Sequence, residues 1–333
     1  MANYKDLHGF EIKHRSSDPP SPIEGEIWYN TSSGTLKLAP LIGAWSSGNN
    51  LPQQSAYVAC CGPDTAGLAW GSQSPPLSPT YRDEAFTYDG TDWTASPDLG
   101  AAKAVTGGVG TQTAALSVGG FFYPGSGGTP PNYRNDTEEY DGSSWSEVAD
   151  YPVKIMSGGI AGTQTAAVLG GGSSHPAITN ATNEYNGSAW TAGENMPSNI
   201  QGHRAWGTQT NAIFCGGEDP SSTANTFNYD GTDYTAGNDM NTARQDSGCA
   251  QNGTATAGLL FGGGPGTKTN TESWNGTSWT NEAGLGTGRS ANGGFGTATA
   301  AVNVGGNPFP GGAIATEEYN KTATVRTIDT TST

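Results

Sequence analysis

Basic residues recur at one place in this otherwise acidic chain, at or just before the strand expected to begin each unit of an internal repeat. These residues are Lys103, Lys154, Arg204, Arg244 and Arg289. Basic groups at matching positions around a closed ring would attract an anion, such as an acidic glycan or a partner carboxylate. Alternatively, each basic group pairs with a carboxylate of its own or the next unit. The recurring candidates for that pairing are Glu139, Glu184, Glu272 and Glu318.

Aromatic residues gather in one long segment, 121–135, which is rich in Pro and Gly. It carries Phe121, Phe122, Tyr123, Tyr133 and Arg134. Aromatic side chains combine a large apolar area with defined geometry, and they suit the recognition of sugars or proteins. This loop is therefore a candidate binding site. The alternative is that Phe121 and Phe122 fill the gap between neighbouring units of the fold.

Few residues are suited to acid–base or metal chemistry. The histidines are His8, His14, His175 and His203, and no Cys-x-x-Cys pair occurs. The four cysteines are Cys60, Cys61, Cys215 and Cys249, which we expect to be buried free thiols. The Asp-Gly pairs lack the intervening acidic ligands of a calcium loop. We expect no catalytic residue, no metal and no cofactor.

The residues above are placed by a repeat with a period of about 45 residues. The phrase Gly110-Thr111-Gln112-Thr113-Ala114-Ala115 returns in related forms. The copies begin at Gly62, Gly162, Gly207, Gly253 and Gly296. A second phrase, Tyr88 to Trp93, keeps the same period, with later copies at 140–145, 185–190, 229–234, 274–279 and, in part, from Tyr319.

Each unit divides into four short strands. In the unit 101–148 we expect them at 104–109, 113–118, 138–140 and 144–147, with Asp141-Gly142 as a two-residue hairpin turn. Four-stranded antiparallel units with periodic Gly and aromatic residues are typical of a β-propeller. The predicted fold is therefore all-β, a six-bladed propeller of four-stranded antiparallel blades with an N-terminal arm and β-hairpin.

The two ends of the chain suggest how the ring closes. We expect a polar arm and a hairpin over 1–40, in which Ile27, Trp28 and Tyr29 dock the protein to a larger assembly, and a propeller over 41–333. The propeller begins with a fourth strand at Trp45 and ends after a third strand at Tyr319. The Trp45 strand is therefore predicted to complete the last blade. The segment 322–328 is the rival, or else lies outside that blade or beside the hairpin.

Charge and hydropathy exclude several partner classes. The formal net charge is −16, which disfavours nucleic acids and anionic membranes as partners. No apolar run is long enough to cross a bilayer, and the N-terminal residues lack the apolar stretch of a secretory signal. We therefore expect neither membrane insertion nor a signal peptide.

The Gly-Gly pair after the second strand, followed by an aromatic residue and a Trp in the next hairpin, resembles the kelch repeat of galactose-oxidase-type propellers over about residues 45–320. The Gly-Thr-Gln-Thr-Ala-Ala form, together with the hairpin sequence at 24–37, resembles bacteriophage tail and fibre proteins. The copper site of an oxidase and the Arg triad, Tyr and Asp-box of a sialidase have no match here. The resemblance therefore implies a non-enzymatic virion protein.

In a meander of four strands, the loops after the second and fourth strands share one face, here called the long-loop face. Its varied loops are 72–82, 121–135, 173–180, 218–224, 264–269 and 307–314. Variable loops on a rigid scaffold commonly carry binding sites. We expect this face to contact host surface glycan or a neighbouring virion subunit, including other copies of this chain. The alternatives are a bacterial extracellular kelch-type binding protein and a glycan-active enzyme with an unrecognised site.

Overall fold

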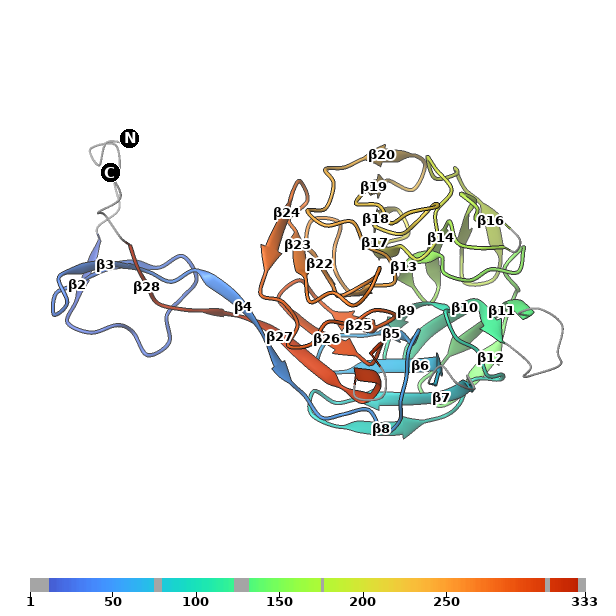
Figure 1. Ribbon diagram of the computed structural model, residues 1–333, viewed down its shortest axis with the longest axis horizontal. Helices are drawn as coiled ribbons and strands as arrows, with labels where there is room; N and C mark the ends of the chain where they lie inside the picture. Colours follow the sequence, from blue (N-terminus) through green and yellow to red (C-terminus); the bar gives the residue numbers. More distant parts are fainter. Residues whose placement is uncertain (1–11, 75–79, 123–131, 175–176, 309–311, 329–333) are drawn as a thin grey trace. The chain divides into compact units, whose positions relative to one another are not determined.

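The computed structural model describes residues 12–74, 80–122, 132–174, 177–308 and 312–328, which form seven four-stranded sheets and the short 3-10 helix η2 (Gly312–Ile314). The chain divides into two compact units. The larger is Trp45–Tyr319, and the smaller combines Met1–Ala44 with Asn320–Thr333. Six sheets are propeller blades arranged around a common axis (Figure 1), and the seventh lies in the smaller unit. The predicted all-β propeller fold is confirmed.

Each blade is a meander whose first strand lies next to the first strands of the neighbouring blades, so the first strands line the axis. Blade one is β5 (Ala59–Cys61), β6 (Gly67–Gln73), β7 (Tyr81–Tyr88) and β8 (Trp93–Ser96). Blade two is β9 (Gly107–Thr111), β10 (Ala114–Phe122), β11 (Asn132–Tyr140) and β12 (Trp145–Glu147). Blade three is β13 (Gly159–Thr163), β14 (Ala166–Gly170), β15 (Thr182–Tyr185) and β16 (Trp190–Ala192).

The other three blades follow the same order. Blade four is β17 (Arg204–Thr208), β18 (Asn211–Cys215), β19 (Thr226–Tyr229) and β20 (Tyr234–Ala236). Blade five is β21 (Gly248–Cys249), β22 (Gly258–Phe261), β23 (Thr271–Trp274) and β24 (Trp279–Glu282). Blade six is β25 (Gly293–Gly296), β26 (Ala300–Val304), β27 (Thr316–Ala323) and β4 (Leu41–Ser47).

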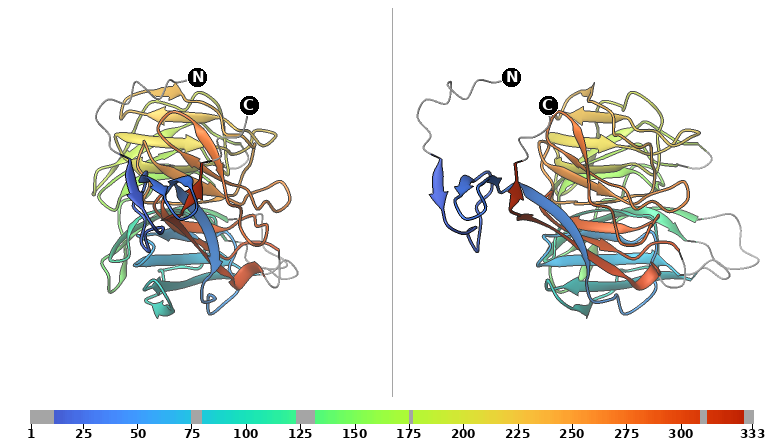
Figure 2. Two further views of the ribbon diagram at one scale, coloured as in Figure 1. Left: turned by 90° about the vertical axis from the view of Figure 1, so that its left-hand side faces the viewer. Right: turned by 60° about the vertical axis from the view of Figure 1, so that its left-hand side comes forward.

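Blade six joins the two ends of the propeller, because β4 comes from the start of the chain and pairs with β27 (Figures 1 and 2). Trp45 on β4 packs against Tyr319, with ring centroids 5.2 Å apart, and against Phe261 of blade five at 4.9 Å. Its indole Nε1 donates to Thr271 Oγ1 at 3.0 Å. The prediction that the Trp45 strand closes the ring is confirmed.

The smaller unit is a sheet in the order β1 (Lys13–Arg15), β2 (Ile27–Asn30), β3 (Thr35–Leu38) and β28 (Arg326–Thr327). The β2–β3 hairpin is the predicted one, and β28 pairs antiparallel with β3, beside the hairpin. The predicted division placed a polar arm and a hairpin in residues 1–40 and the propeller in residues 41–333. In the structure residues 320 onward belong to the smaller unit, and β1 pairs with β2 in parallel.

The repeated Gly-Gly pair of the second strand is explained by steric crowding and backbone conformation, as blade two illustrates. Gly119 and Gly120 have φ of +60° and +105°, and the β10–β11 register shifts between Val118 and Gly120. A Cβ on Gly120 would lie 2.8 Å from the Ala104 carbonyl oxygen. Beyond this bulge β10 and β11 continue to Phe122 and from Asn132, so both strands are longer than predicted.

The hairpin between the third and fourth strands differs from the predicted two-residue turn. Tyr88 pairs with Trp93, so four residues connect the strands. The Asp89 carboxylate accepts the backbone N–H groups of Asp92 at 2.8 Å and Thr91 at 2.9 Å, and these bonds lower the pKa of Asp89. The equivalent side chains are Asp141, Asn186, Asp230 and Asn275.

The repeated Gln and aromatic residues join each blade to the one before it. Gln112 Nε2 donates to the carbonyl oxygens of Gly67 at 3.0 Å and Tyr88 at 2.8 Å, and Gln164 and Gln209 repeat this bridge. A fourth-strand aromatic residue bonds a third-strand Thr of the preceding blade. These pairs are Trp45–Thr271, Trp93–Thr316, Trp190–Thr137, Tyr234–Thr182 and Trp279–Thr226.

We expect Thr226→Val to lower the free energy of unfolding by about 1–3 kcal/mol, because valine keeps the shape but leaves the buried Trp279 N–H without its acceptor. Urea unfolding measures this loss. Thr191→Val is the matched control, since Thr191 is exposed and accepts no indole. Equal losses in the two variants would contradict this role for the Trp–Thr bond.

We also expect acid to remove the stabilising effect of the Asp side chains in the hairpin turns. Because the folded-state pKa of Asp89, Asp141 and Asp230 lies below the ordinary 3.8, their stabilising effect is present above 3.8 and is lost as pH falls through the lowered values. The triple Asp→Asn variant should therefore melt below the wild type at about pH 6, with a difference that shrinks by about pH 2.5. A difference independent of pH would contradict this expectation.

Candidate functional site

The same backbone conformation occurs where each blade's first strand begins, at the long-loop end of the axis. Six residues, one per blade, have left-handed φ between 50° and 67°. Each donates its backbone N–H to the carbonyl oxygen of its counterpart in the preceding blade, at 2.7–3.3 Å, so the bonds form a closed ring. The six residues, here called the axial ring, are Tyr57, Val105, Ser157, Gly202, Asp246 and Ala291.

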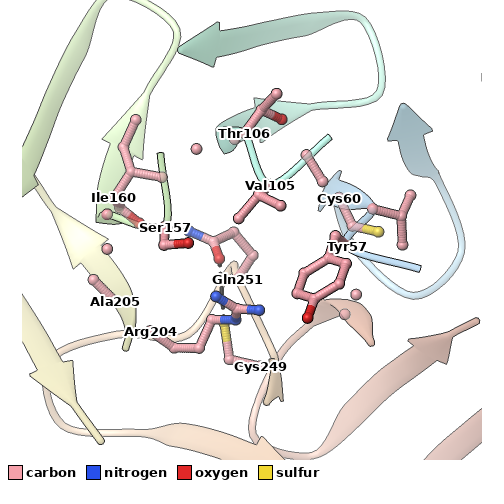
Figure 3. Close-up of a pocket in the computed structure, with 18 of the residues that line it drawn as sticks. Tyr57, Cys60, Val105, Thr106, Ser157, Ile160, Arg204, Ala205, Cys249 and Gln251 are labelled. Atoms are coloured by element: carbon pink, nitrogen blue, oxygen red, sulfur yellow. Dashed lines mark hydrogen bonds between the residues drawn. The ribbon is translucent and has the colours of Figure 1, made fainter. Parts of the chain in front are cut away.

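The first strands enclose an axial pocket of about 60 Å³ beneath this ring (Figure 3). Arg204, Gln251 and Tyr57 point into it from blades four, five and one. Gln251 Nε2 crosses to the Ile160 carbonyl of blade three at 2.8 Å. Near the short-turn end, Asn252 Oδ1 accepts the Gly62 N–H of blade one at 2.9 Å. Side chains of blade five therefore bridge the axis on the short-turn side.

A wider cavity of about 300 Å³, here called the axial mouth, lies at the long-loop end. It shares Tyr57, Val105 and Ser157 with the axial pocket. Its other lining residues are Gln73, Phe121, Met156, Gln201, Gly202, Glu218 and Asp246. Most of the side chains that line the mouth are polar, and Val105, Phe121 and Met156 form an apolar part of the lining.

Two carboxylates give the axial mouth its charge. Glu218 accepts a hydrogen bond from Gln201 Nε2 at 3.1 Å. Burial raises the pKa of Asp246, and the nearby Arg204 charge opposes this only in part. Arg204 directs Nε at the Ser247 carbonyl and Nη1 at the His203 carbonyl, 3.3 Å away. Burial also raises the pKa of Tyr57, to about 12, so its hydroxyl remains protonated.

The predicted ring of basic charge does not form. Lys103, Arg244 and Arg289 are buried and form ion pairs within their own blades. Lys103 Nζ lies 2.6 Å from Glu138 and 2.5 Å from Asp136. Arg244 pairs with Glu272, and Arg289 pairs with Glu317 at 3.1 Å. Such pairing offsets the large desolvation cost of a buried charge.

The other two members of the expected ring are unlike each other. Arg204 is half-buried at the axis, whereas Lys154 is exposed beside blade two. Of the four glutamates considered as partners, Glu272 is correct. Glu139, Glu184 and Glu318 instead accept hydrogen bonds from tyrosines of the following blade, because they lie one residue later in the strand. These tyrosines are Tyr185, Tyr229 and Tyr88.

Blade two carries a third cavity, of about 350 Å³, which brings together four residues singled out from the sequence. It is here called the blade-two cavity, and these residues are Phe122, Tyr133, Arg134 and Lys154. Asn132, Asn135 and Asp136 complete the lining. Arg134 Nε donates to Asp136 Oδ1 at 2.7 Å. Burial alone would raise the pKa of Asp136, but the adjacent Lys103 and Arg134 hold it below its usual value.

The aromatic residues of the same loop have different surroundings. Phe121 and Phe122 pack edge-on against Tyr81 of blade one, with centroid distances of 5.1 and 5.7 Å. They therefore fill the space between two blades, as the alternative interpretation held. Phe121 also lines the axial mouth, and Phe122 lines the blade-two cavity. Tyr123, the remaining predicted binding residue, lies outside the described residues.

The three predicted docking residues divide by burial. Ile27 is 45% exposed, whereas Trp28 is fully buried and donates from Nε1 to Asp18 Oδ1 at 3.1 Å. Tyr29 is half-buried, and its ring lies 5.4 Å from that of His14. The structure therefore corrects the prediction that Trp28 docks to a partner, because Trp28 is fully buried within the smaller unit.

His203 and the four cysteines are buried in the propeller. His203 is buried, its Nε2 accepts the Gly159 N–H at 3.0 Å, and burial lowers its pKa to about 3. The four cysteines are buried and free, and burial raises the pKa of each thiol. Across the described parts of the chain, no three His, Cys, Asp or Glu side chains are grouped to hold a metal ion. In those same parts, no helix is long and apolar enough to span a bilayer.

No sequence-based prediction brought the polar residues of the axial mouth together as a site. These residues are Tyr57, Gln73, Ser157, Gln201, Glu218 and Asp246. The repeat alignment contained a usable signal. These residues stand beside the repeated glycines or just before the first strands, at positions where the residue type differs from blade to blade. A surface lined by such positions is varied on a constant frame, as in other loop-borne sites.

Comparison with known proteins shows the fold alone. No known protein family and no curated protein matches this sequence. Among solved structures 298 chains match. One of them, titled "Structure of YjhT", aligns with a TM-score of 0.65 at 12% identity over 85% of this chain and 99% of that chain. This similarity supports the β-propeller fold. Because one fold hosts many functions, the function has to be argued from the sites.

We expect Lys103→Met to lower the free energy of unfolding by about 3–5 kcal/mol, since it leaves Glu138 buried without its partner. The exposed Lys154→Met should change it by less than about 0.5 kcal/mol. Urea unfolding of the two variants compares these effects directly. Similar values would contradict the assignment of Lys103 to a buried ion pair.

Proposed function

We propose that this chain is a non-enzymatic binding protein of a bacteriophage virion. The propeller, kelch-like in its repeat, presents its long-loop face to a host surface glycan or a neighbouring subunit, and the small sheet attaches it to other virion proteins or to further copies of itself. The observation that carries the binding role is the blade-two cavity. The attachment role is supported by the small sheet and by the resemblance of residues 24–37 to phage tail and fibre proteins.

The blade-two cavity supports an anionic ligand on electrostatic grounds. In a protein of net charge −16, the charged residues that line this cavity are Arg134, Lys154 and Asp136, a local balance of two positive charges and one negative charge. Arg134 and Lys154 line the cavity together with the Phe122 and Tyr133 rings. Rings and basic groups on one surface suit acidic sugar residues or the carboxylates of a partner protein.

Two exposed apolar side chains of the smaller unit support attachment. Ile23 is 73% exposed and Ile27 is 45% exposed. These are two of the three large apolar side chains with high exposure among the described residues, and both lie in a unit of few residues. Exposed apolar side chains close together in sequence are suited to burial against a partner.

The ligand proposal predicts a loss of binding to an immobilised polycarboxylate. Arg134→Ala combined with Lys154→Ala should weaken binding to polygalacturonate about 10-fold or more, since two charged contacts are removed. Lys268→Ala, at a lysine of a blade-five loop on the same face, should leave binding unchanged. Surface plasmon resonance at low salt measures both. Equal effects of the two changes would mean that only overall charge matters.

The virion proposal predicts that the intact chain copurifies with phage particles. Mass spectrometry of density-purified particles should detect it at a fixed ratio to other virion proteins. Ile23→Ser with Ile27→Ser should reduce its incorporation without changing the melting temperature of the propeller. Absence of the chain from purified particles would overturn the virion assignment while leaving the binding role to be judged by the polygalacturonate measurement.

A further inference from the structure

The axial mouth combines a constant backbone with a combination of side chains that differs from blade to blade. In each blade, the residue before the axial-ring position forms a β-bridge with the residue that follows the Gly-Gly position. These bridges are Ala56–Gln73, Ala104–Phe121, Met156–Ser173, Gln201–Glu218, Gln245–Gly264 and Ser290–Asn307. The backbone therefore holds these positions in equivalent places, while their chemistry changes around the ring. Elsewhere in the blades, equivalent positions carry repeated Tyr, Trp, Thr and Gly residues.

The polar residues of the mouth offer many hydrogen bonds in a small space. Tyr57 and Ser157 supply hydroxyls, and Gln73 and Gln201 supply amides, which both donate and accept. Glu218 and Asp246 supply acceptors. A ligand that donates and accepts through several hydroxyl groups matches this set. The cavity of about 300 Å³ is at the small end for ligand sites and suits one sugar ring.

An apolar surface completes the match to a sugar ring. Phe121 and Val105 of blade two, with Met156 of blade three, form part of the same lining. Phe121 is held in place by its edge-on contact with Tyr81, at 5.1 Å. A pyranose ring carries hydroxyls at its rim and C–H groups on its faces, so an aromatic surface beside polar groups suits both of its parts.

The depth of the site is limited by side chains that cross the axis. The mouth continues into the axial pocket through Tyr57, Val105 and Ser157, which line both. Gln251 spans the pocket to Ile160, so the narrow pocket has little room beyond water-sized groups. A ligand entering from the long-loop face therefore stops in the mouth, with Arg204 and Gln251 beneath it.

The charge of the mouth selects against anions, contrary to the sequence-based expectation. Asp246 and Glu218 both face the cavity, and the Asp246 Oδ1 lies beside Gly202, where an added Cβ would be 3.1 Å away. The Arg204 charge acts on Asp246, but its guanidinium is turned to the Ser247 and His203 carbonyl groups. An acidic sugar would bring a third carboxylate into this site.

We propose that the axial mouth binds a neutral sugar unit, with Glu218 and Asp246 accepting hydrogen bonds from its hydroxyls and Phe121 packing against its ring. This site is separate from the blade-two cavity. It rests on the binding role proposed above for the long-loop face, but not on the virion assignment or on the anionic ligand of blade two. One face then holds one site for a neutral sugar and one for an anion, suited to a glycan that contains both neutral and acidic units.

The test is saturation-transfer NMR on the full-length protein. The neutral probes are D-glucose, D-galactose, D-mannose and N-acetyl-D-glucosamine, and the acidic probes are D-glucuronate and D-galacturonate. At least one neutral probe should receive saturation, and neither acid should compete with it. Glu218→Gln combined with Asp246→Asn should weaken that sugar at least 10-fold, whereas Asp219→Asn, at the exposed neighbour of Glu218, should not.

Asparagine tolerates left-handed φ, so Asp246→Asn is compatible with the axial ring. If the double variant nevertheless melts early, Glu218→Gln alone is compared with Asp219→Asn, and the same difference is expected. The proposal is overturned if no neutral probe binds the wild-type protein, if an acid displaces the neutral sugar, or if the Glu218 variant binds as the wild type does. Arg134→Ala with Lys154→Ala should leave this sugar signal intact, which separates failure here from failure of the blade-two site.

Discussion

The closed ring of six backbone hydrogen bonds at the axis is the constraint on which the other features of the propeller depend. It requires a left-handed residue in every blade, and five of the six are not glycine. Such a conformation costs about 1–3 kcal/mol per residue and persists only where the surrounding structure fixes it. Val105 is the costliest case, because a branched side chain disfavours positive φ. The ring therefore contributes precise placement of the mouth residues more than net stability.

What surrounds the ring and fixes it is the set of repeated residues, most of which act between blades. Gln112 and its counterparts bond the strands of the preceding blade, and the Trp–Thr pairs do the same at the outer edge. The second glycine of each pair donates its N–H to the next blade, as Gly120 does to Ile155 at 2.8 Å. The repeated residues thus lie mainly at the contacts between blades and in the hairpin turns. The mouth and the long loops differ from blade to blade, which frees that face for recognition.

The fold could be predicted because the residues that connect neighbouring blades form short local patterns with a fixed period. The Trp45 strand carries enough of this pattern to show how the ring closes. The candidate site was harder to predict from the sequence. Lys103 and Arg244 occupy equivalent positions in the repeat, but the sequence position alone does not show whether the basic side chain is exposed or buried. That depends on one residue of the third strand. It is Glu138 or Glu272 in those two blades, and Phe86 or Phe227 in others. Trp28 was predicted to dock to a partner, but in the structure it is buried and its indole N–H donates to Asp18. The mouth was missed because the residues that form it are defined by differing between repeats.

Amide hydrogen exchange at the axial ring tests the central claim most directly, namely that one closed backbone ring holds the six blades and their mouth as a single frame. If it does, the amides of Tyr57, Val105, Ser157, Gly202, Asp246 and Ala291 exchange together, at the rate set by global unfolding. Exchange of any one of them at the rate of an exposed loop amide, while the others stay protected, would show that the ring is open at that blade and would contradict the claim.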